Sequence, residues 1–137
     1  MSVLVDTSVL SLALRRKRGD LNPLERRIVF RCRELIVAGE AVVIAPIIQE
    51  ALSGISDVGV FEQVRERLVM MLELPIETAC YVLGATYYNI CRGAGISPGA
   101  IDMTICAAAH LHGAAIFTTD PDYAHYARHL PIQLLSY

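Results

Sequence analysis

Val3-Leu4-Val5-Asp6 is a short apolar run that ends directly at a carboxylate. Apolar residues in succession, without polar ones between them, predict a strand that is buried on both faces, as in a parallel sheet. The pattern recurs in the runs from Ala41 to Ala45 and from Ala114 to Thr118, and Asp120 follows the second of these. The three runs therefore predict strands of a mostly parallel sheet.

Helical patterns separate these strands. Asn22-Pro23 starts the clearest helix, with Asn at the N-cap and Pro in the first turn, and apolar residues then repeat at helical spacing until Gly39. Five further helices are expected: from Val9 into a basic cluster that Gly19 ends, from Pro46 to near Gly54, from Val60 to Leu72, from Thr78 to Arg92, and from Ser97 to about His112. Brief strands are expected at Leu74 to Ile76 and at Ile132 to Leu134.

The alternation of strands and helices predicts an α/β fold with a mostly parallel central sheet and helices on both faces, forming one domain over residues 1–137. A hydrophobic content of 54% and a charged content of 19% agree with a globular chain that buries a sizeable core. The net charge of -2 differs from the strongly basic balance of proteins that coat nucleic acid passively.

Cysteine usage and the length of the apolar runs predict a cytoplasmic protein that does not contact a membrane. No apolar run approaches the ~18 residues of a membrane span. Asp6 interrupts the N-terminus before the apolar region of a signal peptide develops. The four cysteines lack CxxC pairing and fall among apolar residues of expected helices, as buried free thiols do: Cys32, Cys80, Cys91 and Cys106.

Four acids fall where the loops of a parallel sheet gather. Asp6 and Asp120 follow strands, Glu50 lies about one helical turn after a strand, and Asp102 lies in the first turn of a helix. Since sites in open α/β sheets form outside the carboxyl ends of the strands, we expect all four carboxylates at one edge. Taken singly, an Asp after a strand is often only a helix cap or turn residue. Glu50 and Asp102 have apolar neighbours, where an unpartnered charge is unfavourable, and this favours a functional role.

Four carboxylates in one cleft repel one another, and without cations some of them would remain protonated. A divalent ion removes this conflict, and hard oxygen ligands favour Mg²⁺ or Mn²⁺ over zinc. Such ions lower the pKa of a bound water and stabilise the attacking and leaving oxygens of a phosphodiester. The acids therefore predict metal-dependent hydrolysis without a protein nucleophile.

The segments around these acids resemble, in order and spacing, the acidic segments of PIN-domain nucleases. The third segment is an acid that opens an Ala-rich helix, and the fourth is a Thr-x-Asp-x-Asp-aromatic turn, with Tyr where Phe is common. The resemblance covers nearly the full chain, and the size of the chain looks most like that of VapC-type toxins of toxin–antitoxin pairs. The four segments are Val5-Asp6-Thr7-Ser8, Gln49-Glu50-Ala51-Leu52-Ser53-Gly54, Ile101-Asp102-Met103-Thr104-Ile105-Cys106-Ala107-Ala108-Ala109 and Thr118-Thr119-Asp120-Pro121-Asp122-Tyr123.

The resemblance implies a PIN-like three-layer sandwich and an endoribonuclease that requires Mg²⁺ or Mn²⁺. It assigns metal binding and catalysis to four acids and makes Asp122 a more variable fifth one. The hydroxyls of Thr118 and Ser8 would be supporting groups. It further implies an RNA product with a 5′-phosphate, a homodimer, and a cognate antitoxin whose tail blocks the cleft. The four acids are Asp6, Glu50, Asp102 and Asp120.

The basic run has two interpretations. Arg matches phosphate oxygens in a bidentate way, so the run is a natural RNA contact beside the site. Basic residues are also favoured at helix C-termini, so it is equally a solvated helix end. The run comprises Arg15, Arg16, Lys17 and Arg18.

Two other functions remain open. A degenerate PIN fold would serve only in binding or dimerisation, and the intact acid set argues against it. An aspartyl-phosphate enzyme or receiver would need a second Asp two residues after Asp6, or an acidic pair before it, and a late Lys, whereas position 8 is Ser8 and the only lysine is Lys17. His125 and His129 share a helix face at i, i+4, but no third ligand accompanies them, which favours a surface pair.

Overall fold

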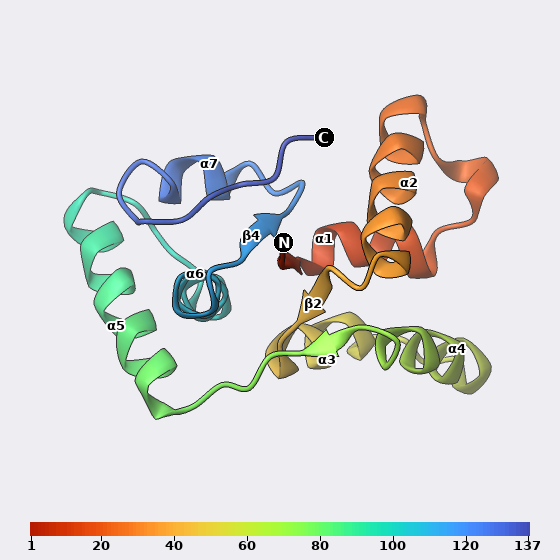
Figure 1. Cartoon of the computed structure of the whole chain (residues 1–137), viewed down its shortest axis with the longest axis horizontal. Coiled ribbons are helices and arrows are strands. Elements are labelled where there is room, and N and C mark those ends of the chain that lie inside the picture. Colours follow the sequence, from red (N-terminus) through yellow and green to blue (C-terminus); the bar gives the residue numbers. More distant parts are fainter.

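Four parallel strands form the centre of the computed structural model, which describes all 137 residues (Figure 1). Their order in the sheet is β3-β2-β1-β4, so β1 lies between β2 and β4. This arrangement confirms the predicted parallel sheet, and the three predicted runs form its strands β1, β2 and β4. The strands are β1 (Val3–Val5), β2 (Ala41–Val43), β3 (Leu72–Glu73) and β4 (Ala115–Phe117).

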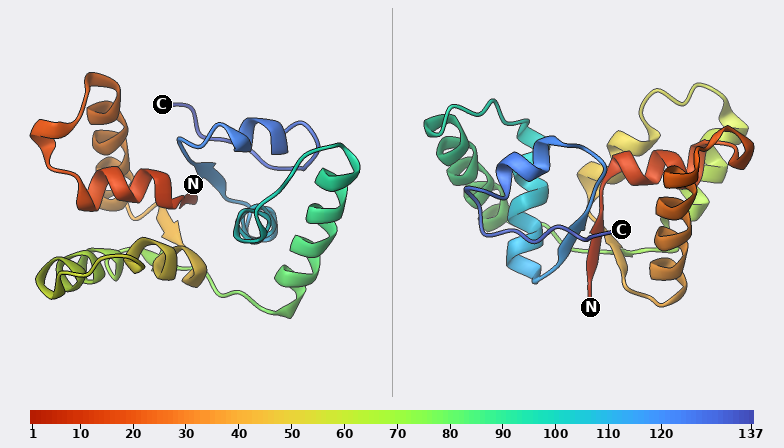
Figure 2. Two further views of the ribbon diagram at one scale, coloured as in Figure 1. Left: turned by 180° about the vertical axis from the view of Figure 1, so that it is seen from behind. Right: turned by 90° about the horizontal axis from the view of Figure 1, so that it is seen from above.

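Helices cover both faces of this sheet. Helices α1 to α4 pack together on one side, and α5 and α6 pack against each other on the other side, together with α7 (Figures 1 and 2). Their bounds are α1 (Thr7–Leu10), α2 (Pro23–Val37), α3 (Ala45–Leu52), α4 (Val58–Leu68), α5 (Thr78–Gly93), α6 (Ala100–His112) and α7 (Asp122–Tyr126). None of these helices combines the length and the apolar character that crossing a bilayer requires.

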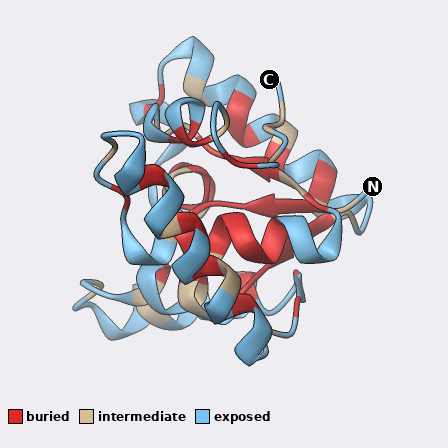
Figure 3. Cartoon of the chain, turned by 90° about the vertical axis from the view of Figure 1, so that its left-hand side faces the viewer, coloured by how far each residue is buried: buried red, intermediate tan, exposed pale blue.

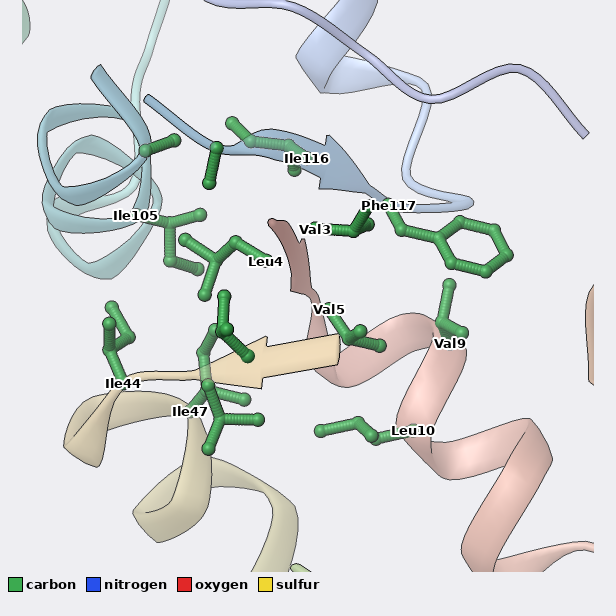
Figure 4. Packing of buried hydrophobic residues seen from close by; sticks show 14 of the residues in the cluster. Val3, Leu4, Val5, Val9, Leu10, Ile44, Ile47, Ile105, Ile116 and Phe117 are labelled. Carbon is green, nitrogen blue, oxygen red and sulfur yellow. The ribbon is translucent and has the colours of Figure 1, made fainter. Parts of the chain in front are cut away.

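The core lies on both sides of β1, whose three residues have no exposed surface. Successive side chains of a strand point to opposite faces. Accordingly, Leu4 points toward Ile105 of α6, whereas Val5 lies on the side of Leu10 of α1 (Figure 4). Strands β1, β2 and β4 and the sides of the helices that face them are largely buried, while the outer sides of the helices are exposed (Figure 3). A strand apolar on every residue is therefore sandwiched between two helical layers, as its sequence predicts.

The capping prediction for α2 is confirmed in detail. The Asn22 side chain accepts a hydrogen bond from the Glu25 amide at 2.8 Å, and the Asn22 amide donates one to the Glu25 carboxylate at 3.0 Å. Together these bonds satisfy amide groups that the first turn of a helix otherwise leaves without partners. All four cysteines are buried and free, as predicted.

The first helix is shorter than predicted. Helix α1 passes into a π-helical turn over Ser11–Arg15, and the backbone is already extended at Arg16. No apolar residue lies between Leu14 and Leu21. Because this basic segment has nothing to pack against the core, the helix ends at Arg15, the first residue of the predicted cluster, and only a short 3-10 turn follows at Arg18–Asp20.

Two peripheral strands also differ from the prediction. The pairing predicted at Leu74 to Ile76 starts earlier, at Leu72–Glu73, and its last bond joins the Leu74 amide to the Val43 carbonyl at 2.8 Å. Pro75 has no amide hydrogen and cannot extend this ladder. The strand predicted near the C-terminus is a single parallel bridge between Ile116 and Leu134.

Candidate active site

The strand register brings Asp6 and Thr118 together. Val5 of β1 pairs with Phe117 of β4, and the next residue on each strand is Asp6 or Thr118. The Asp6 amide continues the ladder by donating to the Phe117 carbonyl at 2.9 Å. Two residues that are 112 positions apart in the sequence are therefore neighbours at the carboxyl end of the sheet.

Two hydroxyls hold the Asp6 carboxylate. Ser8 Oγ and Thr118 Oγ1 each donate to Asp6 Oδ2 at 2.8 Å. Asp6 is the N-cap residue of α1, but its side chain makes no capping bond, and only 6% of the residue is exposed. Its carboxylate is therefore not the helix cap that the simpler interpretation would require. It is oriented by hydroxyls, as buried charged groups need to be.

The loop after β4 continues this network. The Asp120 amide donates to Thr118 Oγ1 at 3.0 Å, and the Thr119 amide donates to Ser8 Oγ at 3.0 Å. Asp120 Oδ1 accepts from the Asp122 amide at 2.9 Å, so one of its oxygens performs a local turn function. Asp122 itself is exposed, and its side chain makes no hydrogen bond.

Two tyrosines from α7 hold the Asp102 carboxylate. Tyr126 Oη donates to Asp102 Oδ2 at 2.9 Å, and Tyr123 Oη donates to Oδ1 at 3.2 Å. Both rings are buried, and burial raises the pKa of both phenols, so the hydroxyls stay protonated donors at neutral pH. The bonds join the first turn of α6 to the helix that follows Asp120.

The electrostatics of Asp102 connect the three aspartates. Burial raises the pKa of Asp102 above its ordinary value, the hydrogen bonds from Tyr126 and Tyr123 oppose this rise, and the negative charges of Asp6 and Asp120 add to it. Like charges raise the pKa of a carboxyl group only when they lie near it. Asp6, Asp102 and Asp120 therefore share one electronegative site at the carboxyl edge of the sheet.

Comparison with known families decides where this chain belongs. The family described as PIN domain matches residues 3–129, which is most of the chain. This chain belongs to the PIN-domain family. The predicted membership, and with it a place among hydrolytic nucleases, is thereby confirmed. A search of curated proteins found no match.

Solved structures show the same PIN fold. FitAcB from Neisseria gonorrhoeae is 20% identical, with a TM-score of 0.71, and the alignment covers 98% of this chain and 96% of that one. FitAB bound to an IR36 DNA fragment is 19% identical, with a TM-score of 0.75, and the coverage is 97% and 93%. VapBC2 from Rickettsia felis, bound to a DNA fragment from its promoter, is 12% identical, with a TM-score of 0.75 and coverage of 99% and 98%. At these identities the likeness concerns the fold.

Glu50 stands apart from the three aspartates of this PIN domain. It lies in the second turn of α3, which follows β2 at the same edge of the sheet. Its side chain is exposed and makes no hydrogen bond or salt bridge. The structure thus brings three of the four predicted acids into one electrostatic site and leaves the fourth without a hydrogen bond to it.

The donor set fits a hard divalent cation. Every candidate ligand is a carboxylate oxygen, the type that Mg²⁺ and Mn²⁺ prefer. Asp6 Oδ1, Asp120 Oδ2 and both Glu50 oxygens have no hydrogen-bond partner and so retain their lone pairs. No three Asp, Glu, His or Cys side chains already converge into a metal-binding group. The PIN domain therefore presents oriented oxygens rather than a closed cage.

Sequence reasoning missed the tyrosine hydroxyls. It noted Tyr123 only as the aromatic residue of the last acidic segment and did not assign Tyr126 any role. The available signal was two tyrosines at i, i+3 in a segment that follows the last acid, since a buried phenol usually has a hydrogen-bond partner. The partner itself depends on how α7 packs on α6.

The predicted basic residues lie outside the acid site. Arg15, Arg16, Lys17 and Arg18 are all exposed. Arg16 and Arg18 line a hollow against α2 that also holds Arg26 and Arg33. The histidines of the i, i+4 pair, His125 and His129, are exposed as well, in agreement with a surface pair.

Proposed function

We propose that this PIN domain is a metal-dependent endoribonuclease and the toxin of a VapC-type toxin–antitoxin pair. Its similarity to FitAB and VapBC2 covers nearly the whole chain in both directions and supports the toxin assignment. With that assignment come a homodimer, a cognate antitoxin that blocks the acid site, and action on RNA in the cytoplasm.

The observation that carries the proposal is the shared placement of Asp6, Asp102 and Asp120. Each is held by a separate contact, yet the charges of Asp6 and Asp120 act on Asp102. Negative charges that act on one another at partly buried positions are unfavourable unless a cation or a proton compensates for them. We assign Asp6, Asp102, Asp120 and Glu50 as metal ligands, and Asp122 as an outer contributor.

The chain's own groups position the reaction. The hydroxyls of Ser8 and Thr118 fix Asp6 so that Oδ1 stays available, and Tyr126 and Tyr123 fix Asp102. Glu50, exposed and without a hydrogen-bond or salt-bridge partner, is free to rotate toward an ion held by the aspartates. When present, Mg²⁺ or Mn²⁺ would activate a water and neutralise charge on the phosphoryl oxygens. In the proposed hydrolysis, a water oxygen would bond to phosphorus as the bond from phosphorus to the 3′ oxygen breaks, and the products would be a 5′-phosphate and a 3′-hydroxyl that has taken a proton from that water.

Cleavage of a mixed cellular RNA pool tests this proposal. The purified chain, freed of any antitoxin, is incubated with Mg²⁺, with Mn²⁺ or with EDTA, beside an Asp102→Asn variant. We expect cutting that requires the metal and disappears in the variant. Equal cutting by the parent and the variant would contradict the proposed role of the acids.

A binding module without catalysis is the second candidate. The observation in its favour is that no three acidic, histidine or cysteine side chains converge into a metal-binding group. The same RNA assay separates the two functions when it is combined with a Mn²⁺ titration. A chain that neither cuts RNA nor binds Mn²⁺ is a binding module.

A further inference from the structure

A hollow of about 270 Å³ lies between α2 and the segment that follows α1. Its floor is apolar, with Leu12 and Val29 among the buried residues. Four arginines line it, and no Asp or Glu does. Two come from the segment after α1 and two from α2: Arg16, Arg18, Arg26 and Arg33.

These arginines have no internal counter-ion. The only salt bridge of the chain joins Arg65 to Glu62 on α4. Of the four guanidinium groups, only that of Arg26 makes a hydrogen bond, from Nη1 to the Leu21 carbonyl at 2.8 Å. Each guanidinium carries five donors, so most donors in the hollow lack a protein acceptor. Gathered positive charge with free donors is complementary to phosphate, which arginine binds in bidentate fashion.

An aromatic ring stands beside the charges. Arg26, Phe30 and Arg33 follow one another at i, i+4 and i+7 on α2, so they share one face of the helix. Phe30 is 66% exposed although it is large and apolar. Exposed aromatic rings interleaved with arginines are how proteins bind single-stranded nucleic acid, with bases stacking on the rings and phosphates contacting the basic groups.

A second hollow joins this one to the acid site. It shares Leu12 and Arg16 with the first and reaches Ser8 and Thr119, which belong to the Asp6 network. Tyr137 also lines it, and the C-terminus ends beside α2 in every view (Figures 1 and 2). The one acid in its lining is Glu25, whose carboxylate accepts from the Asn22 amide in the helix cap.

We propose that the two joined hollows form a binding track for single-stranded RNA. The RNA would run along this track from the scissile bond at the acid site toward α2. Arg16, Arg18, Arg26 and Arg33 would contact phosphates, and Phe30 would stack on a base. The track rests on the proposed nuclease function and adds to it the part of the substrate that lies outside the acid site.

Binding of a fluorescein-labelled, single-stranded 12-nucleotide RNA of mixed sequence, measured by anisotropy in an Asp102→Asn background, tests the track. The variant Arg26→Gln/Arg33→Gln is expected to bind about tenfold more weakly or worse. The plot of log affinity against log salt should become less steep by about 1.4, or 0.7 for each lost phosphate contact. Phe30→Ala should weaken binding about fivefold or more and leave that slope unchanged.

Arg27→Gln is the matched control, because Arg27 is exposed on the same helix but does not line the hollow. It should change affinity by less than about twofold, and thermal unfolding should show all variants folded. If the double variant binds like the background protein, or if Arg27→Gln weakens binding equally, the track is wrong, and an acidic peptide is then the occupant to test.

Cleavage by the unsubstituted protein keeps the two proposals separate. If the parent cuts RNA but substitution of Arg26 and Arg33 leaves the affinity for RNA unchanged, the track is wrong and the nuclease proposal stands. A chain that neither cuts nor binds RNA overturns both the track and the nuclease proposal. Loss of affinity confined to the variants in the hollow, with cutting by the parent intact, supports both.

Discussion

Asp6 and Asp102 carry the same chemical group, but the fold holds them by different means. Asp6 is fixed by the hydroxyl of Thr118, which the register of β1 and β4 places beside it, and by the hydroxyl of Ser8 in α1. Asp102 is fixed by phenols on α7, a helix that meets α6 only through tertiary packing. Glu50 has neither kind of support. The comparison teaches that the strand-end acid is a property of the sheet, whereas the helix-end acid depends on the docking of one helix on another.

The largest difference in the rate of RNA cleavage is expected between a variant of Asp6, which hydroxyls hold in place, and a variant of Glu50, which has no such support. Asp6→Asn should lower the rate of RNA cleavage on the order of 10²–10³-fold, because it removes a charged ligand of the divalent ion that is proposed to neutralise the reacting phosphate. Glu50→Gln should lower it about tenfold, because this exposed side chain is hydrated and must first be ordered. Initial rates on one RNA at saturating Mg²⁺ measure both. Equal losses would show that Glu50 is held as firmly as Asp6.

The hydroxyl support at Asp6 should appear in stability. Thr118→Val removes a donor to Asp6 and the acceptor of the Asp120 amide, both near the core. We expect a loss of about 1–3 kcal/mol in the free energy of unfolding, measured with urea. Ser8→Ala should lose about 1 kcal/mol, since the Thr118 bond to Asp6 remains. Thr118→Ser retains the hydroxyl and is the control. Equal stability of Thr118→Val and Thr118→Ser would mean that the Thr118 hydroxyl does not stabilise the fold through its bond to Asp6.

Loss of the phenol hydrogen bonds to Asp102 should weaken metal binding. Tyr126→Phe keeps the ring and removes the 2.9 Å bond, so Mn²⁺ binding should weaken about tenfold, as when an outer partner of a metal ligand is lost. Tyr123→Phe removes a longer bond of 3.2 Å and should have a smaller effect. Calorimetric titration of both variants ranks them. Unchanged affinity in Tyr126→Phe would mean that the phenol only fills space.

The smallest effect is expected at Cys32, whose thiol is buried and, unlike the carboxylates of Asp6 and Asp102, has no hydrogen-bond partner. Burial raises the pKa of the Cys32 thiol to about 11, against a weaker opposing effect of Arg33. The unfolded chain therefore ionises Cys32 first, and the stability that the neutral thiol contributes is full below pH 9 and is lost as the pH rises toward 11. The loss should be at most about 3 kcal/mol.

The difference between the parent and Cys32→Ala isolates this contribution. Urea unfolding at pH 8 and at pH 10.5 should show that the difference in the free energy of unfolding between the two proteins is smaller at the higher pH. A difference that grows with pH would contradict the raised pKa of Cys32. The folded parent should also resist thiol reagents at pH 8, because the reactive form is the thiolate.

The sequence predicted what strand and cap chemistry determine locally. Val3 to Val5 is apolar on every residue, which predicts the observed buried strand, and the acid that follows predicts a candidate site at the end of this strand. Asn22 and Pro23 likewise predict the start of α2, where the Asn22 side chain caps the first turn by accepting from the Glu25 amide.

What escaped prediction depends on contacts between distant segments. Both residues of β3 are exposed, so the strand leaves no buried pattern to detect, and its limits are set by pairing with β2. The bonds from Tyr123 and Tyr126 to Asp102 arise only once α7 packs on α6. The Arg26 and Arg33 hollow forms because the segment after α1 folds back on α2.

The central claim is that oriented aspartates at one edge of the sheet bind a divalent cation. Calorimetric titration of Mn²⁺ into the purified parent and into Asp102→Asn tests it without knowledge of the RNA. We predict saturable binding by the parent and an affinity about 10–100-fold lower in the variant, with both proteins equally folded. A parent that binds no Mn²⁺, or a variant that binds it as tightly as the parent does, would contradict the claim.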